Sequence, residues 1–533
     1  MNNVELTVRT LEQAGVRWVF GVPSGPVLPF IEALRKSSGI DFILTASESA
    51  AGFMAEAVGR LTGVPGVCAS TVGPGATNLA TGVGGAFLDR SPVLAFTCNY
   101  PTRLLGRRTQ MLIDHQALFT PITKSSFQLS AGNVSTTLSS AVEMAISQPP
   151  GPVHIDFPED VALAATEEKV ADVVSAKELG VPPTDLPTRA GALLKQAKLP
   201  IVVLGLTFTR SKRLDYLLEF IVRQGVPFVT TLHAKGFLPE SHPACLGVMG
   251  RARRTDVQRM IDKADLLITV GFDPIEIDYE EWAANAPVIH LSDEPVQADT
   301  PINVVYQATG DINAITEALA SIEPIANEWD RSEWANHRTA LDSALRPASN
   351  GMAAHHVIDL LRESLPPNTI LTYDVGAHTH QIASQWSTDT PHTAVATNGW
   401  SSMGYGMPAA YAAKLVHPER TVVGVIGDGC FQMTVGELAT ARRLGLAVPI
   451  VVLNDGWLGL MKVKQERSDY PSSGAFLGEQ TEPPTNYFGV PVRSVSDLSG
   501  LNDALRWALS LGGPSVIEAF IDVEPYSQTV FDI

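Results

Sequence analysis

The chain has 533 residues, of which 45% are hydrophobic and 18% charged, and this length and composition predict a globular protein of about three domains. Its formal net charge of -18 disfavours nucleic acid or an anionic membrane as a partner, because an acidic molecule attracts neither. The N-terminus has no secretion signal and no long apolar run follows, so neither export nor membrane spanning is expected. The 4 cysteines are widely spaced without a CxxC, which favours a reducing cytoplasm over a disulfide framework or a thiolate zinc site.

Short apolar strands alternate with amphipathic helices along the chain, which predicts an α/β fold of three doubly wound domains with mainly parallel sheets. The expected domains are residues 1-165, 190-330 and 352-533. A charged, proline-containing segment at 166-190 predicts a linker, and residues 327-345 predict a polar helical connector. The expected strands lie, in chain order, within "WVFGVP", "DFILTASE", "GVCAST", "PVLAFT", "PVHIDFP", "PIVVLG", "PFVTTL", "DLLITVGFD", "APVIHLS", "NTILTYDVG", "HTAVAT", "TVVGVIGDG", "PIVVLND" and "PSVIEAFID".

Residues 422-455 form one predicted strand, helix, strand unit. The apolar runs at 422-427 and 448-453 are the strands, Thr434 and Glu437 predict a capping box, and Gly445 marks the end of the helix. A connection through one helix makes the two strands parallel and right-handed, so their carboxyl ends meet at one edge of the sheet.

That edge is where open α/β sheets bind ligands, and here it receives Asp428 together with Asn454 and Asp455. Oxygen ligands beside glycines that let a phosphate approach the backbone suit a magnesium ion that holds a diphosphate. Taken alone, Gly-Asp-Gly or Asn-Asp-Gly is more often an ordinary turn at a strand end, and it is their paired placement that favours the metal site.

Across its full length the sequence resembles thiamine-diphosphate-dependent enzymes of the acetohydroxyacid synthase and pyruvate decarboxylase superfamily. The resemblance rests on Gly-Asp-Gly with its Asn-containing strand end, and on "SESAAGFMAEAVGRLTG" (47-63), "GPGATN" (73-78), "DVGAH" (374-378) and "MGYGMPAA" (403-410). "FTPITK" (119-124) and "VGFDPIEIDYEEWAANAPVIHL" (270-291) are most similar to the flavin-independent, catabolic type of acetolactate synthase. The resemblance implies thiamine diphosphate and Mg2+ as cofactors, with a flavin left open as a structural passenger. It also implies a homodimer or homotetramer with sites shared between chains.

Thiamine chemistry needs a carboxylic acid at the aminopyrimidine ring, whose amino group then removes a proton from the thiazolium carbon. The resemblance assigns this role to Glu48, and a poorly solvated position would keep its proton available. Without the resemblance, Glu48 would be only a helix-starting residue stabilised by the helix dipole. The resemblance also places Gln110, with Arg107 and Arg108 beside it, near the reacting substrate. Met403 matches the bulky apolar residue beneath the cofactor, although a Met in an apolar stretch is commonly core filler.

The resemblance further implies which residues hold the rest of the cofactor. Glycine lets a phosphate approach the backbone, and helix N-termini favour negative charge. His378 has the alternative role of orienting its loop. The implied positions are Pro74 and Asn78 at the pyrimidine, and Gly376, Ala377, His378, Gly427, Gly429 and Cys430 at the diphosphate.

One departure from the family pattern lies at the metal. Where the family carries Asn-Asn, this chain has Asn454-Asp455, and counting from Asp428 puts Asp455 at the usual ligand position. A carboxylate would still bind magnesium, with the carbonyl of Trp457 as the third ligand. If the strand were shifted by one residue, Asn454 would be the metal ligand instead of Asp455.

A second departure concerns the substrate. Lys464 stands where biosynthetic acetohydroxyacid synthases carry a substrate-sorting tryptophan, and Leu460 lies one helical turn before it, so both can face the cofactor. A lysine there disfavours large apolar substrates and favours small or anionic 2-oxo acids, unless it is merely solvated.

These features predict decarboxylation of a 2-oxo acid, with pyruvate expected, and transfer of the remaining acyl unit to a second carbonyl compound, as in acetolactate synthesis. The alternative is a simple 2-oxo acid decarboxylase, a lyase that releases an aldehyde. Decarboxylases of the pyruvate type carry a His-His pair in the first domain, whereas "RRTQMLIDHQ" contains only His115, which favours the transferase. Glu48 argues against an inactive cofactor-binding subunit. The second domain lacks a GxGxxG opening, which argues against a flavin or nicotinamide oxidoreductase.

Overall fold

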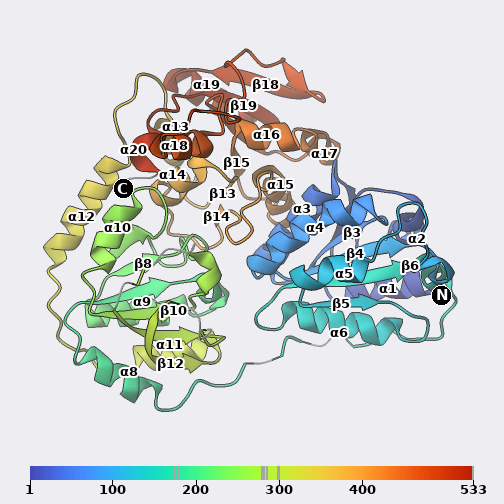
Figure 1. The fold of residues 1–533 in the computed structure, drawn as a ribbon, viewed down its shortest axis with the longest axis horizontal. Coiled ribbons are helices and arrows are strands. Elements are labelled where there is room, and N and C mark those ends of the chain that lie inside the picture. Colours follow the sequence, from blue (N-terminus) through green and yellow to red (C-terminus); the bar gives the residue numbers. More distant parts are fainter. Residues whose placement is uncertain (173–174, 178, 278–281, 284–285, 297–300, 531–533) are drawn as a thin grey trace.

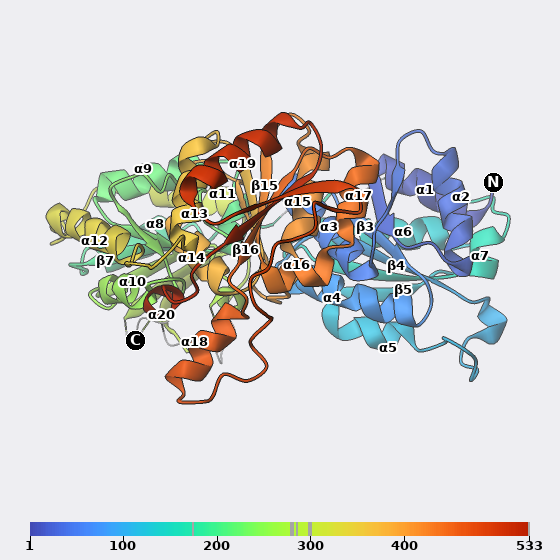
Figure 2. The same cartoon turned by 90° about the horizontal axis from the view of Figure 1, so that it is seen from above.

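The computed structural model describes residues 1-172, 175-177, 179-277, 282-283, 286-296 and 301-530, which form three α/β units. Figure 1 shows the C-terminal unit above the middle and N-terminal units, and Figure 2 shows it between them. Parts of the predicted linker (173-174 and 178) and of the stretch at 270-291 (278-281 and 284-285) lie outside the described residues. The predicted α/β fold with mainly parallel sheets is confirmed.

The N-terminal unit has a parallel sheet in the order β2-β1-β3-β4-β6-β5. Its inner strands are buried because helices cover both faces. The strands are β1 (Trp18–Gly21), β2 (Asp41–Leu44), β3 (Gly66–Ser70), β4 (Val93–Asn99), β5 (Ser125–Gln128) and β6 (Pro152–Pro158). The helices are α1 (Asn3–Gln13), α2 (Leu28–Lys36), α3 (Glu48–Thr62), α4 (Pro74–Leu88), α5 (His115–Phe119), α6 (Val134–Ile146) and α7 (Glu159–Leu163), with short 3-10 turns η1 (Gly25–Val27), η2 (Thr102–Leu104) and η3 (Thr120–Ile122).

The middle unit has a second parallel sheet, in the order β12-β11-β10-β7-β8-β9. The predicted polar connector forms α12, which leads from this unit to the next. The strands are β7 (Pro200–Leu204), β8 (Phe228–Thr230), β9 (Cys245–Val248), β10 (Leu266–Val270), β11 (Pro287–Ser292) and β12 (Asn303–Thr309). The helices are α8 (Leu186–Leu194), α9 (Leu214–Gln224), α10 (Arg254–Ile261), α11 (Ile312–Ala320) and α12 (Arg331–Ala344), with η4 (Leu206–Arg210) and η5 (Pro274–Glu276).

The C-terminal unit has a sheet in the order β14-β13-β15-β16-β19-β18-β17, parallel except for the antiparallel pair β17 and β18. The strands are β13 (Ile370–Tyr373), β14 (Ala394–Val395), β15 (Val422–Gly427), β16 (Pro449–Asn454), β17 (Asn486–Tyr487), β18 (Val490–Val495) and β19 (Ser515–Phe520). The helices are α13 (Ala354–Ser364), α14 (Ala377–Gln385), α15 (Gly406–Val416), α16 (Asp428–Thr434), α17 (Glu437–Leu444), α18 (Gly459–Arg467), α19 (Leu498–Ser510) and α20 (Tyr526–Thr529).

The N-terminal and C-terminal units share one apolar core, formed largely where α3 packs on α15. The rings of Phe53 and Tyr405 meet edge to face with centroids 5.7 Å apart. The Tyr405 hydroxyl donates to the carboxylate of Glu56 at 2.6 Å. The contact between the two outer units is therefore built from both apolar and buried polar groups.

The predicted capping box is wrong. The chain from Asp428 to Leu444 forms two helices rather than one, because α16 ends at Thr434 and α17 begins at Glu437. The Thr434 hydroxyl donates back to the carbonyl of Cys430, and the Glu437 carboxylate binds backbone of the N-terminal unit. The prediction for Gly445 is confirmed, since it follows α17 with φ +62°.

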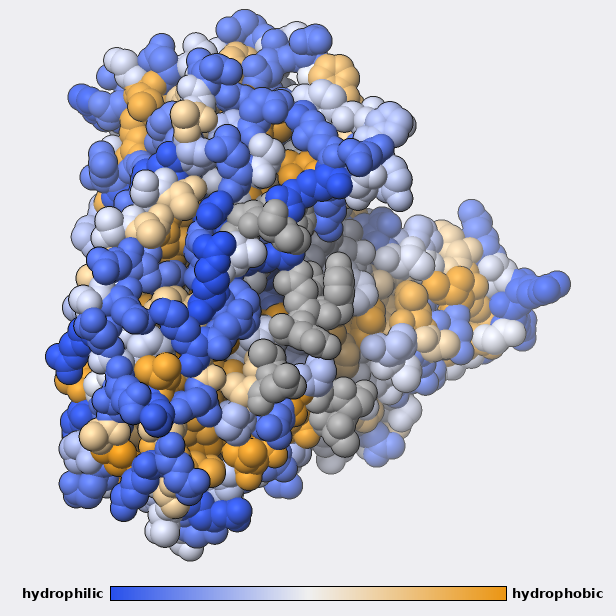
Figure 3. Space-filling view, turned by 60° about the vertical axis from the view of Figure 1, so that its left-hand side comes forward, coloured by the Kyte–Doolittle hydropathy of each residue, from blue (hydrophilic) through white to orange (hydrophobic). Residues whose placement is uncertain are grey.

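Hydrophilic side chains cover much of the face seen in Figure 3. None of the helices in the described part of the chain is long and apolar enough to cross a membrane.

Candidate active site

Two carboxylates stand at the carboxyl ends of β15 and β16, which pair in parallel as far as Gly427 and Leu453. The Asp428 carboxylate accepts the backbone N–H of Gly429 at 2.8 Å and of Gly456 at 2.9 Å. Asp455 follows β16, and its carboxylate accepts the N–H of Trp457 at 2.8 Å. The predicted meeting of the two strand ends is thus present in the structure.

Asp455, rather than Asn454, is the residue beside Asp428. The Asn454 amide donates to Glu518 on the neighbouring strand β19 at 2.7 Å. Burial raises the pKa of Asp428 to about 6, and burial together with the charge of Asp428 raises the pKa of Asp455 well above its usual range. Such a pair is costly unless a proton or a cation compensates it.

The donor set restricts which metal would fit this edge. Within the described residues no group of three or more His, Cys, Asp or Glu side chains is placed to hold a metal ion. A cation here would therefore rely on two carboxylates, a backbone carbonyl and oxygens from outside the protein. Magnesium, which keeps few protein ligands and binds phosphate oxygens, fits such a set.

The N-terminus of α14 lies against the same edge through His378. A Cβ added to Gly376 or Gly427 would come within 2.9 Å or 3.0 Å of the His378 ring, so a larger residue at either position would force the ring to shift. His378 is buried, which lowers its pKa to about 4, and its Nε2 has no hydrogen-bond partner among the described residues. The site thus contains a neutral ring with an unused polar atom beside the first residue of α14, Ala377, where an anion would be favoured.

Met403 lies over the glycine that follows Asp428. A Cβ added to Gly429 would come within 3.3 Å of the Met403 methyl group. The loop that contains Met403 is held by the buried carboxylate of Asp374, which accepts the N–H of Gly404 and of Gly406, each at 2.9 Å. Asp374 is the first residue of the "DVGAH" motif, and its role in holding this loop was not predicted from the sequence. The sequence signal that could have identified Asp374 is an acidic residue directly after an apolar strand.

Cys430 and Trp457 complete this part of the site. The Cys430 thiol is buried, which raises its pKa well above the usual value, and it donates to the carbonyl of Val375 at 3.2 Å. Trp457 packs against Phe476 with ring centroids 4.7 Å apart. Both residues therefore sit beside the carboxylate pair with their side chains already in contact with protein.

Glu48 is the first residue of α3, half-buried at the surface of the N-terminal unit. Its carboxylate accepts the amide N–H of Asn78 at 3.1 Å, and a Cβ added to Gly75 would come within 3.2 Å of it. Pro74, which begins α4, and Asn78 are exposed. The structure brings together these three residues predicted to face the pyrimidine.

Gln110, Arg107 and Arg108 lie on an exposed loop of the same unit. The loop rests on the "GPGATN" turn, because a Cβ added to Gly73 would come within 2.2 Å of the carbonyl oxygen of Met111. Gln110 therefore stands next to a residue that touches the predicted pyrimidine-binding turn.

His115 is fully engaged within the N-terminal unit. Its Nδ1 lies 2.9 Å from the Asp156 carboxylate, and its Nε2 accepts the N–H of Gly73 at 3.2 Å. The ring is buried. His115 thus holds the "GPGATN" turn and keeps neither nitrogen for a substrate.

A cavity of about 1190 Å³ opens beside Gly376, between the middle and C-terminal units. Leu460 and Lys464 of α18 both line it, as their spacing predicted. Arg251, Arg254 and Arg467 line it as well. Burial and the charges of Arg251, Arg254 and Lys464 lower the pKa of His380, which also lines it, to about 3, so positive charge gathers at this wall.

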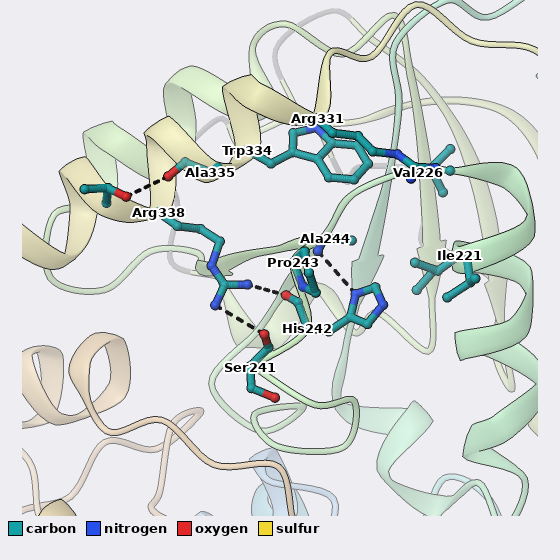
Figure 4. A pocket seen from close by; sticks show the side chains of 13 residues that line it. Ile221, Val226, Ser241, His242, Pro243, Ala244, Arg331, Trp334, Ala335 and Arg338 are labelled. Atoms are coloured by element: carbon teal, nitrogen blue, oxygen red, sulfur yellow. Dashed lines mark hydrogen bonds between the residues drawn. The ribbon is translucent and has the colours of Figure 1, made fainter.

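Another cavity, of about 490 Å³, lies within the middle unit between α9 and α12. Figure 4 shows Arg338 of α12 reaching the backbone carbonyls of Ser241 and His242. None of the predicted site residues lines this cavity. The site residues predicted from the sequence all belong to the two outer units.

The three units match family models of one class of enzyme in the same order. They are the thiamine pyrophosphate enzyme N-terminal TPP binding domain over residues 1-118, the central domain over 188-319 and the C-terminal TPP binding domain over 374-519. The chain therefore belongs to the thiamine pyrophosphate (diphosphate) enzymes.

Within that class its relatives are acetolactate synthases. It is 31% identical to the probable acetolactate synthase large subunit of Methanococcus aeolicus, over 98% of this chain and 92% of that protein. It is equally 31% identical to the acetolactate synthase isozyme 1 large subunit of Escherichia coli K12 (98% and 94% covered) and to the acetolactate synthase of Bacillus subtilis 168 (97% and 93% covered). The predicted thiamine-diphosphate-dependent, acetolactate synthase-like enzyme is thus confirmed.

Proposed function

We propose that the enzyme decarboxylates a 2-oxo acid, with pyruvate as the expected substrate, and joins the remaining acyl unit to a second carbonyl compound. The product would be a 2-hydroxy-2-methyl-3-oxo acid such as acetolactate. The names of the relatives support this outcome. The observation that carries it against aldehyde release is His115, the histidine of the stretch "RRTQMLIDHQ", because both of its ring nitrogens are occupied and neither is free for proton transfer.

Thiamine diphosphate supplies the electron sink that decarboxylation requires. Glu48 would hold a proton at the aminopyrimidine ring, next to Asn78 and Pro74, and Gln110 would contact the substrate. Met403 would support the cofactor from below. The backbone N–H groups of Ala377, His378 and Cys430 would receive the diphosphate, and that of Gly429 would have to leave the Asp428 carboxylate to join them.

Magnesium is part of the proposal because of the carboxylate pair. Asp428 and Asp455, with the carbonyl of Trp457, would hold the ion, and Asn454 stays bonded to Glu518. Burial and the charge of Asp428 together raise the pKa of Asp455, and the cation would offset both effects. No flavin enters the proposed chemistry.

The charged cavity supports an anionic substrate. A 2-oxo acid brings a carboxylate, and Lys464 with Arg251, Arg254 and Arg467 lines the space beside Gly376 where it would arrive. Arginine and lysine favour such groups through charge-assisted hydrogen bonds. The four buried cysteine thiols agree with a reducing compartment, and the cytoplasm is the proposed location.

We propose that two chains share each site, in a homodimer or homotetramer. Within the described residues Glu48 is bonded to Asn78 of its own unit, and no hydrogen bond joins it to Asp428 or Asp455. Mixing Glu48→Gln chains with Asp428→Ala chains tests this. Shared sites would restore about a quarter of wild-type activity through mixed dimers, because one site in each is intact. Sites within one chain would restore none.

The proposed function is tested by incubating the enzyme with pyruvate, thiamine diphosphate and Mg2+, and identifying the products by NMR. Acetolactate is expected. Acetaldehyde as the principal product would favour the simple decarboxylase. Consumption of no pyruvate would reject pyruvate as the substrate.

A further inference from the structure

Glu437 begins α17 in the C-terminal unit, yet its carboxylate serves the N-terminal unit. Its Oε1 accepts the backbone N–H of Ala46 at 2.8 Å and of Ser47 at 3.1 Å. These two residues form the turn between β2 and α3, directly before Glu48. The Glu437 side chain is 1% exposed, so the contact is made away from water.

Further groups of α17 hold the same turn. The Thr440 hydroxyl donates to Oε2 of Glu437 at 2.8 Å, and Arg443 donates to the carbonyl of Leu44 at 2.7 Å. A Cβ added to Gly436 would come within 3.1 Å of the Ala46 Cβ. The end of β2 and the turn after it are thus fixed by the neighbouring unit.

The N-terminal unit itself holds this turn through Thr45, whose N–H donates to the carbonyl of Gly21 at 3.1 Å and whose hydroxyl donates to the carbonyl of Ser47 at 2.8 Å. β2 is an edge strand, and its last residue, Leu44, is 40% exposed. On the other side of the turn, the Ser47 hydroxyl caps α3 by accepting the N–H of Ala50 at 3.2 Å. The direction in which α3 starts, and with it the place of the Glu48 carboxylate, therefore depends on what holds residues 44-47.

We propose that Glu437 is a positioning residue for Glu48, acting by fixing the turn from which α3 starts; the inference rests on the proposed role of Glu48 at the aminopyrimidine. Catalytic groups must be placed to a fraction of an ångström, and an error of about 1 Å costs up to about a hundredfold in rate. Because α16 begins at Asp428 and α17 at Glu437, one short segment connects the metal-binding edge with the turn that sets Glu48.

The test measures hydrogen-deuterium exchange at the thiazolium carbon of bound thiamine diphosphate, which needs no 2-oxo acid. Glu437→Ala should slow this exchange about ten- to a hundredfold, because the turn loses its acceptor. Glu437→Gln should exchange nearly as fast as the wild type, since its amide oxygen can accept the same two N–H groups. Cofactor affinity, measured by calorimetry, should change little in either variant.

Glu168 offers a matched control. Its carboxylate also accepts two successive backbone N–H groups, of Val134 at 3.3 Å and Ser135 at 2.9 Å, at the start of α6 in the same unit. Glu168→Ala should therefore lose the same kind of contact without slowing exchange. Equal slowing in Glu168→Ala and Glu437→Ala would mean that general loosening of the unit is the cause, and would overturn the proposal.

Wild-type exchange in Glu437→Ala would overturn the proposal, as would equal slowing in Glu437→Gln. Should Glu437→Ala fail to fold, Glu437→Asp replaces it, because the shorter side chain keeps the charge but not the reach, and it should exchange slowly. Exchange in Glu437→Asp at the wild-type rate would again contradict the proposal. If the wild type itself does not accelerate exchange over free cofactor, the proposed function fails instead.

Discussion

The carboxylates of Asp428 and Asp455 stand so close at the ends of β15 and β16 that the charge of Asp428 helps to raise the pKa of Asp455. A magnesium ion between them would turn this repulsion into binding. Asp428→Ala should therefore abolish binding of thiamine diphosphate, whereas Asp455→Asn should remain active because an amide oxygen still reaches the metal. Calorimetric titration with cofactor and Mg2+ measures both. Wild-type affinity in Asp428→Ala would show that Gly-Asp-Gly is only a turn.

The same pair predicts the stability of the metal-free enzyme. Because burial and the charge of Asp428 raise the pKa of Asp455, the metal-free fold at about pH 7 must either hold two close charges or take up a proton, and both cost free energy. Asp455→Asn removes this cost, so the metal-free variant should unfold at a higher temperature than the metal-free wild type. Excess Mg2+ should narrow or reverse this difference in unfolding temperature, because the ion binds the two carboxylates of the wild type. A lower unfolding temperature for the metal-free variant would contradict the repulsion.

Glu48→Gln should lower turnover by about a hundredfold, the effect of a lost acid-base group, with cofactor affinity nearly unchanged. Thiazolium exchange and steady-state rates measure the loss. Glu32→Gln, at an exposed glutamate of α2 paired with Arg35, is the matched control and should behave as the wild type. An unchanged exchange rate in Glu48→Gln would remove Glu48 from the mechanism.

His115→Leu should destabilise the N-terminal unit without changing the chemistry. It leaves Asp156 and the N–H of Gly73 without their buried partner, at a cost of about 1–3 kcal/mol. Urea unfolding measures the loss, and NMR measures the ratio of acetaldehyde to acetolactate. A change in that ratio would give His115 a part in proton transfer.

Lys464→Trp should move the substrate preference toward 2-oxobutyrate. The wild type should prefer small or anionic 2-oxo acids, because a large apolar group would strip water from the lysine and its arginine neighbours. Competition assays with paired 2-oxo acids measure the preference. Met461→Trp is the control, because Met461 lies on the same helix but does not line the cavity, and this variant should keep the wild-type substrate preference. Identical product ratios in Lys464→Trp and the wild type would refute the idea.

His154, on β6 of the N-terminal unit, predicts that the stability of the fold depends on pH. Burial lowers its pKa to about 3, so the unfolded chain, with a usual value of 6.5, binds the proton first as the pH falls. His154→Phe keeps the stacking on Phe119, whose ring centroid lies 4.2 Å from that of His154. From pH 6.5 downward the wild type should lose stability relative to this variant by about 1.4 kcal/mol per pH unit. Urea unfolding at about pH 7 and pH 5 measures the difference in the free energy of unfolding between the wild type and His154→Phe. If this difference is the same at both pH values, the lowered pKa of His154 is contradicted.

The sequence predicted the inner strands well, because strands such as β15 and β16 are buried on both faces and appear as continuous apolar runs. It missed β5, β9, β12, β17 and β18. Four of these are edge strands, and most are half-exposed with mixed composition, so no apolar run marks them.

The site divides in the same way. Asp428, Asp455 and the "GPGATN" turn lie in local motifs, so their place in the site could be proposed from the sequence. The structure then brings Asp428 and Asp455 together. The role of Glu437 could not be predicted from the sequence, because its partners lie 390 and 391 residues away along the chain. In addition, a local capping box accounted for the same residue. Long-range polar contacts between units leave no periodic signal.

The buried carboxylate pair at the ends of β15 and β16 also bears on how long the chain survives after synthesis. Ligands that bind only the folded form stabilise it, by about 2.7 kcal/mol at a hundredfold excess over the Kd. Proteases degrade the transiently opened form. The abundance of this enzyme would accordingly track the supply of vitamin and metal, and starvation for thiamine would deplete the polypeptide as well as its activity.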